Sequence, residues 1–118
     1  RLFDFRQGYT SRWKPASSTS SALFFIDTES VQRFSYGVSY LWVLQVDRQL
    51  AQGISDNGEY YRLQYAFKCS ERKYALRHAS GDNNHGGTES HTVPDFRLSW
   101  ELIMPGTAIE QISKYVCR

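Results

Sequence analysis

Two cysteines, Cys69 and Cys117, restrict the folds open to this 118-residue chain more than any other feature of its sequence. They are its only cysteines, and they form neither a CxxC pair nor a Cys/His spacing typical of zinc sites. Such a pair is either two buried free thiols in a reducing compartment or one disulfide in an oxidising compartment. A disulfide would close a loop of about 49 residues and contribute roughly 4 kcal/mol by the chain-entropy model. That is a large share of the roughly 5–10 kcal/mol that stabilises a small domain.

The C-terminal segment predicts a helix that begins after a Pro-Gly pair and carries Cys117 near its end. Thr107 and Glu110 have the S/T-x-x-E spacing of a capping box, which satisfies two amide donors at a helix start. The apolar face of this segment consists of Ile109, Ile112 and Val116. A helix of about eleven residues is marginal alone in water, so it must dock on the rest of the fold. We therefore predict that Cys117 bonds Cys69 and holds this helix across a sheet.

Apolar or alternating runs predict about six strands. These runs are residues 22–26, 31–36, 38–46, 60–69, 72–78 and 91–103, the last of which is extended at first, with Pro94 marking an edge or a break. The segment at 27–30 is expected to be a turn between the first two strands. The predicted fold class is α+β, an antiparallel sheet of about six strands with the C-terminal helix packed on it.

The segments between these strands are polar and rich in turn residues. Stretches at 51–60 and 79–90 predict exposed loops. Residues 1–21 close with the run ASSTSSA and are expected to be an N-terminal extension or linker. Trp13 is the exception, because a ring of that size is expected to dock on the domain. The domain itself is expected to span residues 22–118.

The strand at 38–46 is apolar on both faces. One face carries Val38, Tyr40, Trp42, Leu44 and Val46, and the other carries Ser39, Leu41, Val43 and Gln45. Such a strand is central and covered on both sides, by its own chain or by a partner chain. The strand at 60–69 alternates cleanly instead, which predicts an inner apolar face and an exposed polar face. Its inner residues are Tyr61, Leu63, Tyr65, Phe67 and Cys69.

Composition and charge limit the class of protein. Aromatic residues make up 15% of the chain, which supplies enough ring area for one folded domain. No run approaches the roughly 20 apolar residues needed to cross a bilayer, and no signal-like segment is present. The chain starts at Arg1 without a methionine, so we expect that an upstream segment was removed, by a signal peptidase or in the choice of the chain's ends. A net charge of +2 does not require nucleic acid as a partner.

No set of residues has a catalytic or metal-binding spacing in the sequence. The histidines His78, His85 and His91 match no zinc pattern and are expected to be exposed. The HGG run lacks the G-x-S-x-G elbow that would accompany an oxyanion turn. Carboxylates such as Asp56 and Glu59 lie in predicted turns, where acidic residues cap the chain or face solvent. The sequence therefore predicts a protein that is not an enzyme and has no cofactor or metal.

Basic residues gather on the outward phase of two strands that we expect to be adjacent. They are Arg62, Lys68, Lys73 and Arg77, and Tyr60 shares their face. A sheet face of this composition suits an acidic protein segment or a sulfated glycan. The alternative is an ordinary solvated sheet face. We take the four basic residues as candidate ligand-binding residues.

Four segments, in order, share their pattern with one known family. They are FFIDTESVQRF, VSYLWVLQV, FKCSERKYAL and WELIMPGTAIEQISKYVC, within roughly residues 23 to 117. They contain an aspartate turn, a W-V-L strand, a cysteine before an R-x-Y strand, and a tryptophan and cysteine around a Pro-Gly helix start. This ordered set resembles the surface-adhesin protein E family of Gram-negative bacteria. Trp13 resembles a tryptophan that often precedes the first strand, whereas the run SGDNNHGGTES is the least family-like part.

The resemblance implies a twisted antiparallel sheet with a C-terminal helix joined to it by Cys69 and Cys117. It also implies export to the periplasm or the outer cell surface. Known members include adhesins that bind host extracellular-matrix and serum proteins, and dimerisation occurs in the family, so a protein ligand and a homodimer are the partners it suggests. Two alternatives stay open. One is a periplasmic structural or regulatory protein, with the strand at 38–46 buried against a partner; the other is a carrier of a small ligand in a Tyr- and His-rich pocket.

Overall fold

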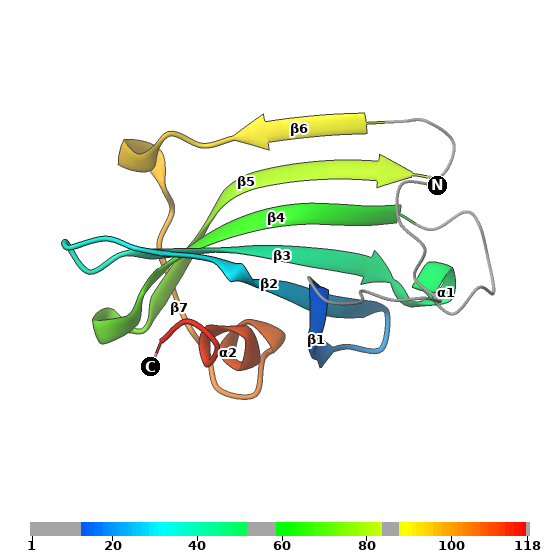
Figure 1. Cartoon of the computed structure of the whole chain (residues 1–118), viewed down its shortest axis with the longest axis horizontal. Coiled ribbons are helices and arrows are strands. Elements are labelled where there is room, and N and C mark those ends of the chain that lie inside the picture. The colour runs from blue at the N-terminus through cyan, green and yellow to red at the C-terminus, as the bar shows by residue number, and fades with distance from the viewer. Residues whose placement is uncertain (1–12, 52–58, 84–87, 118) are drawn as a thin grey trace.

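A computed structural model of the chain describes residues 13–51, 59–83 and 88–117. Within these residues the main element is one antiparallel sheet whose first six strands are neighbours in chain order (Figure 1). The strands are β1 (Trp13–Ser18), β2 (Ala22–Arg33), β3 (Ser39–Asp47), β4 (Glu59–Lys68), β5 (Lys73–Asn83), β6 (Thr88–Thr92) and β7 (Glu101–Leu102). The short β7 pairs with the first two residues of β5. The helices are α1 (Arg48–Ala51) and α2 (Ala108–Ser113), with 3-10 turns η1 (Cys69–Glu71) and η2 (Asp95–Arg97).

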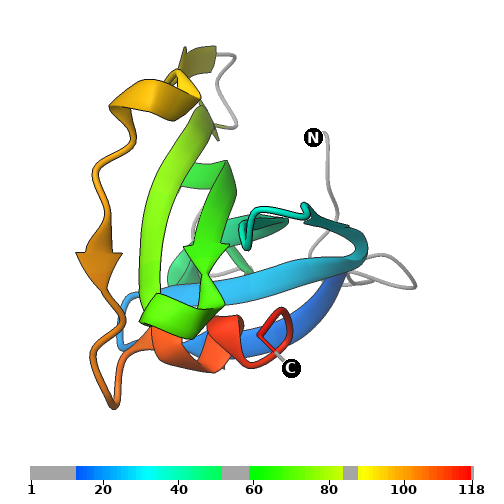
Figure 2. The same cartoon turned by 90° about the vertical axis from the view of Figure 1, so that its left-hand side faces the viewer.

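The predicted antiparallel sheet with a C-terminal helix and one disulfide is confirmed, but the sheet has seven strands among the described residues and not six. Two predicted strands are merged into β2, and two strands arise where loop or linker was expected. The sheet is strongly twisted, so that β2 runs across the view of Figure 2 whereas β5 runs up it. Figures 1 and 2 both show α2 against one face of the sheet, next to β1.

Strand β1 occupies part of the segment that was expected to be extension or linker. It pairs antiparallel with β2 along the edge of the sheet, with Trp13 opposite Asp27 and a register shift after Pro15. An edge strand faces solvent along one side and tolerates proline, so its polar composition resembles that of a loop. The loop interpretation of ASSTSSA was therefore wrong for residues 16–18, while residues 1–12 of the predicted extension lie outside the described residues.

The expected turn at residues 27–30 is a bulge within the single strand β2. Asp27 pairs with Trp42 and Gln32 pairs with Tyr40, so residues 28–31 face only one residue of β3. The Ser30 hydroxyl donates to the Asp27 carbonyl at 2.6 Å and accepts from the Trp42 amide at 3.0 Å. Turn-forming side chains thus close a local loop at residues 28–31, and β2 pairs with β3 on both sides of that loop. The interpretation of two separate strands was wrong for this reason.

Strand β3 lies at the centre of the sheet and is buried on both faces, as predicted. On the α2 side the core contains Ile26, Leu41, Val43, Leu63, Phe67, Ile103, Ile112 and Val116. The opposite face of the sheet carries two smaller clusters, Phe25 with Leu44, Val46 and Tyr60, and Val38 with Tyr40 and Ala66. Trp13, Leu98 and Trp100 pack on these smaller clusters. The chain itself therefore covers both faces of β3, and the apolar strand needs no partner chain to explain it.

The alternation predicted for β4 is confirmed on its inner face but not on its outer face. Leu63 and Phe67 belong to the core under α2, with Tyr61, Tyr65 and Cys69 packed against it. The outer face was expected to be exposed, yet Tyr60, Gln64 and Ala66 are buried. The cause is tertiary: the segment after β6 places Leu98 and Trp100 on the cluster that contains Ala66, and Tyr60 packs in the cluster that Trp13 covers. The polar run at 79–90 is likewise largely strand, because β5 extends to Asn83 and β6 begins at Thr88.

Helix α2 forms where the capping signal predicted it, and it is shorter than the expected eleven residues. The Thr107 hydroxyl accepts from the Glu110 amide at 3.2 Å, and the Glu110 carboxylate accepts in turn from the Gly106 amide at 3.0 Å. Ile112 and Val116 are buried against the sheet. The predicted Cys69–Cys117 disulfide is present, with a Cα–Cα distance of 5.3 Å, and it attaches the chain after α2 to the end of β4.

Candidate functional site

One row of side chains crosses the sheet on the face opposite α2. Directly paired residues of neighbouring strands project to the same side. The row contains Trp13, Asp27, Trp42, Gln64, His78 and Thr92, one residue from each of β1 to β6. It depends on the bulge in β2 and on a second bulge in β5, because a one-residue slip would send a strand's side chains to the other face. Aromatic and polar groups are thereby gathered in one line.

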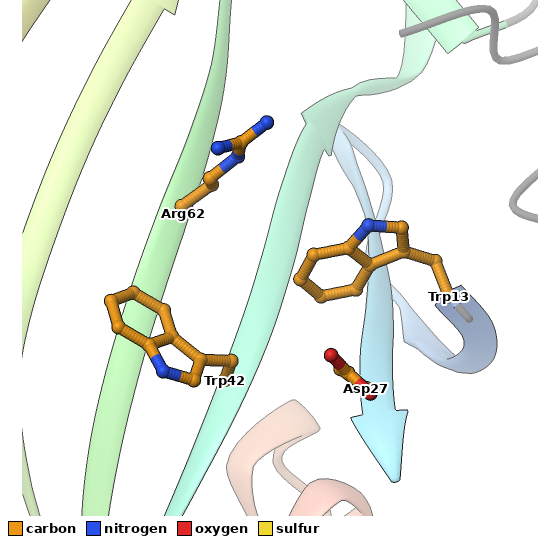
Figure 3. Close-up of a pocket in the computed structure, with 4 residues that line it drawn as sticks. All are labelled: Trp13, Asp27, Trp42 and Arg62. Atoms are coloured by element: carbon orange, nitrogen blue, oxygen red, sulfur yellow. The ribbon is translucent and has the colours of Figure 1, made fainter. Parts of the chain in front are cut away.

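A cavity of about 370 Å³ opens at the β1 end of this row. Among the described residues it is lined by Trp13, Asp27, Trp42 and Arg62. Figure 3 shows these four side chains projecting from four neighbouring strands around a common space. Arg62 pairs with Leu44, two residues along β3 from Trp42, so it reaches the cavity from the next row. We call this site the tryptophan pocket.

The two charged residues of the tryptophan pocket differ in exposure. Asp27 is 1% exposed, and its Oδ1 accepts a hydrogen bond from the Glu29 amide at 3.1 Å. Arg62 is exposed and forms no hydrogen bond or ion pair with the residues that the structure describes. The pocket therefore presents an accessible guanidinium above a buried carboxylate, between two indole rings. Arginine and tryptophan are the residues that most often dominate binding energy at protein interfaces.

Trp42 is held in place by its neighbours in the row. Its ring meets the His78 imidazole edge-on, with centroids 5.4 Å apart. The His78 Nδ1 shares a hydrogen bond of 2.6 Å with the Thr92 hydroxyl, which fixes the imidazole in turn. Because each ring has a partner, the indole is oriented before any ligand arrives, which lowers the entropy cost of binding.

Arg77 occupies the bulge of β5 and ties η2 to the sheet. Its Nη1 donates to Gln64 Oε1 at 2.6 Å and its Nε donates to Asp95 Oδ1 at 2.8 Å. The guanidinium lies 4.6 Å from the centroid of the Tyr40 ring, and the Tyr40 hydroxyl donates to Asp95 Oδ2 at 3.1 Å. The hydrogen bond from Arg77 lowers the pKa of Asp95, and burial raises the pKa of Tyr40 with a further contribution from Asp95. This network is a structural tie between η2 and three strands.

A family model described as surface-adhesin protein E matches residues 13–118. The chain belongs to the surface-adhesin protein E family. Comparisons with curated proteins and with solved structures found no significant match. The match begins at Trp13, the first residue of β1 and one wall of the tryptophan pocket.

Membership of the surface-adhesin protein E family confirms the resemblance inferred from the ordered segments. A family of surface adhesins groups exported, cell-surface proteins, and it points to a binding protein and not to an enzyme. In the described part of the chain, no helix has the length and apolar composition to span a bilayer. The same residues contain no group of three His, Cys, Asp or Glu side chains arranged to hold a metal ion. Of the three histidines, His78 is part of the row, His91 is exposed, and His85 lies outside the described residues.

The four basic residues predicted from the sequence do lie on one face of the sheet, opposite α2. Lys68 pairs directly with Lys73, so their side chains share one face of the sheet. Arg62 and Gln64 project from β4 on the same side as Lys68, and Arg77 contacts Gln64 there. They do not form one compact patch, because six residues of extended strand, about 20 Å, separate Arg62 from Lys68. Their role in binding stays a prediction.

The surroundings of these four residues in the surface-adhesin protein E fold differ. Lys68 Nζ lies 4.4 Å from the centroid of the Trp100 ring. Lys73 Nζ lies 3.7 Å from Glu71 Oε1, and Arg77 is bonded to Asp95 and Gln64. Arg62 alone among the four has no such contact within the described residues. Of the four, it is the side chain most available to a ligand.

Sequence reasoning missed three residues of the tryptophan pocket as site residues. Trp13 was expected to dock, Trp42 was placed on a covered strand, and Asp27 was expected in a turn. Their common feature is that they are direct cross-strand partners in β1, β2 and β3. No spacing in the sequence carries that information, since the bulge in β2 sets the register. The one available signal was an acidic residue directly after the apolar FFI run.

The tie between Arg77 and Asp95 gives a pH-dependent prediction. Because Arg77 lowers the pKa of Asp95 below its ordinary 3.8, this tie stabilises the fold above that pH and is lost as pH falls through the lowered pKa. Asp95→Asn should therefore lower the free energy of unfolding at neutral pH, by at most about 1 kcal/mol because the pair is solvent-screened. The difference from the unmodified chain should shrink in urea unfolding at about pH 2. In an Arg77→Gln background the same substitution should show a weaker pH dependence; an unchanged dependence would contradict the assignment to this pair.

Proposed function

We propose that the chain is a non-catalytic binding module of the Gram-negative cell envelope that recognises host extracellular-matrix or serum proteins. The observation that carries this proposal is the family match over residues 13–118, since the family is one of surface adhesins. The disulfide supports it as well, because such bonds persist in the oxidising compartments outside the cytosol. An outer-surface location is the part of this proposal that distinguishes it from a purely periplasmic role.

We propose that the contact surface is the sheet face opposite α2, with Arg62 and the tryptophan pocket as its centre. Interface centres are rich in tryptophan and arginine, and here two indoles flank an accessible guanidinium. Lys68, Lys73 and Arg77 belong to the same proposed face. We expect them to contribute less than Arg62, because each already has a partner within the chain. A ligand would have to displace those contacts before it gained new ones.

Charge reversal at Arg62 tests the proposal. Arg62→Glu should weaken binding to immobilised matrix or serum proteins by about tenfold, the loss expected for one charge-assisted hydrogen bond at an interface. Lys114→Glu is the matched control, since Lys114 is an exposed cation at the C-terminal end of α2 and makes the same change in net charge. Biolayer interferometry with a panel of such proteins measures both variants, and circular dichroism checks that each one is folded.

The outcomes separate adhesion from the alternative functions. An equal loss of binding affinity in Arg62→Glu and Lys114→Glu would indicate a nonspecific charge effect and count against a contact at Arg62. Absence of binding by the unmodified chain to any matrix or serum protein would count against a host ligand and favour a periplasmic interaction protein. The carrier alternative is favoured by one observation, the cavity of about 370 Å³, and it predicts binding of a small molecule without any protein ligand.

A further inference from the structure

We propose that the tryptophan pocket is a subsite for one neutral pyranose sugar, so that the receptor of this chain is a glycan or a glycosylated protein. This inference deepens the proposed function and rests on it for the identity of the receptor. It names the chemistry that the pocket itself recognises. Three properties of the pocket favour such a ligand: its two flat apolar walls, its opposite charges and its small volume.

The two indoles supply apolar walls with fixed orientation. Trp42 is fixed by the edge-on contact with His78 and by the hydrogen bond of its amide to Ser30. Trp13 is fixed by its pairing with Asp27 in the sheet and by packing on the cluster that contains Phe25 and Leu44. Indole rings offer large rigid surfaces at little entropy cost. The complementary ligand has a flat apolar face, and the C–H groups on one side of a pyranose ring form such a face.

The charged residues of the pocket favour a neutral ligand. A ligand with a net charge of either sign would be attracted by one of Arg62 and Asp27 and repelled by the other, so the pair gives the pocket no strong preference for an ionic ligand. A sugar hydroxyl both donates and accepts hydrogen bonds, and neighbouring hydroxyls match the fork of five N–H donors on a guanidinium. Arg62 has no described partner to release before it binds them. A neutral ring with a polar edge therefore satisfies both the apolar walls and the guanidinium.

The volume sets the size of the ligand. A cavity of about 370 Å³ lies near the lower end of the roughly 300–1,000 Å³ range of small-molecule sites. That space suits a single ring of a longer glycan and excludes a folded peptide segment.

Indole NMR signals of the full chain provide a direct test. The protein has three tryptophans, and two of them line the pocket, while Trp100 lies under Lys68. Titration with neutral methyl pyranosides should shift the indole N–H signals of Trp13 and Trp42 saturably and leave that of Trp100 in place. Trp42→Leu keeps apolar bulk but removes the flat ring, and it should weaken the affinity about tenfold. Phe96→Leu is the matched control at an exposed aromatic residue away from the pocket.

Each alternative result overturns the inference. Shifts produced only by glucuronate and sulfate, or only by lysine methyl ester, would indicate a charged ligand. No saturable shift with any neutral pyranoside, or equal affinity in Trp42→Leu, would show that the pocket does not bind sugar. The proposed function is tested separately, by binding of enzymatically deglycosylated matrix protein. Undiminished binding of the deglycosylated protein, with no sugar-induced shift, overturns the sugar subsite and leaves the adhesin proposal standing. Sugar-induced shifts without any binding to matrix protein support the sugar subsite and count against the adhesin proposal.

Discussion

Replacing both cysteines, as Cys69→Ala with Cys117→Ala, is expected to lower the free energy of unfolding by about 4 kcal/mol. The disulfide joins residues 48 positions apart, and closing a loop of that length removes a large amount of conformational entropy from the unfolded chain. Removal of the disulfide also releases α2, whose six residues cannot maintain a helix in water without docking. For a domain whose total stability is of the order of 5–15 kcal/mol, the effect is a large fraction of the whole.

Urea unfolding followed by tryptophan fluorescence measures this change. The unmodified chain in the presence of a reductant should unfold at nearly the same urea concentration as the double variant, and reductant should not alter the variant. Similar unfolding midpoints for the oxidised chain and the double variant would show that the bond adds little to the packing of α2. In that case the apolar contacts of Ile112 and Val116 would be sufficient to hold the C-terminal segment.

Phe67→Ala is expected to lower the free energy of unfolding by about 3–5 kcal/mol, the second large effect. Phe67 is completely buried, and it is the largest fully buried side chain among the residues that the structure describes. It belongs to the core between the sheet and α2, where β3, β4 and the helix meet. Truncation removes the transfer free energy of the ring and leaves a cavity that the rigid sheet cannot close.

The matched control for this substitution is Phe96→Ala. Phe96 is 84% exposed in η2, so its truncation should change the free energy of unfolding by no more than about 0.5 kcal/mol. If Phe67→Ala does not fold, Phe67→Leu keeps the measurement within range, with an expected loss of about 1 kcal/mol. A loss from Phe67→Ala as small as that from Phe96→Ala would contradict the position of the core beneath α2.

The tryptophan pocket shows where sequence reasoning about the site reached its limit. Arg62 was identified from its outward phase on a strand, and that assignment needs only the two-residue period. Trp13, Asp27 and Trp42 could not be grouped with it, because their proximity depends on pairing between β1, β2 and β3. Pairing register depends in turn on the bulge at residues 28–31, whose side chains resemble those of a turn.

The exposure of the basic residues also depended on long-range contacts. Lys68 and Arg77 project from the outer face of their strands, as predicted. The segment after β6 nevertheless places Trp100 against Lys68 and Asp95 against Arg77. A strand's period specifies which side chains share a face, but not what covers that face. The exposed-face prediction for β4 failed for the same reason, since Ala66 is buried where Leu98 and Trp100 pack and Gln64 is buried beside Arg77.

Local chemistry in the sequence determined the antiparallel sheet, the inner face of β4, the two-sided burial of β3 and the capped C-terminal helix. The sequence also predicted the Cys69–Cys117 bond, because two cysteines allow only one pairing, and the structure decided between that bond and two free thiols. These features follow from side-chain period, capping residues and cysteine number, which are properties of neighbouring residues. The tertiary structure alone decided that β1 belongs to the sheet and that residues from four strands enclose one pocket. Those outcomes depend on register between strands distant in sequence, and register is fixed by packing and bulges that no local pattern encodes.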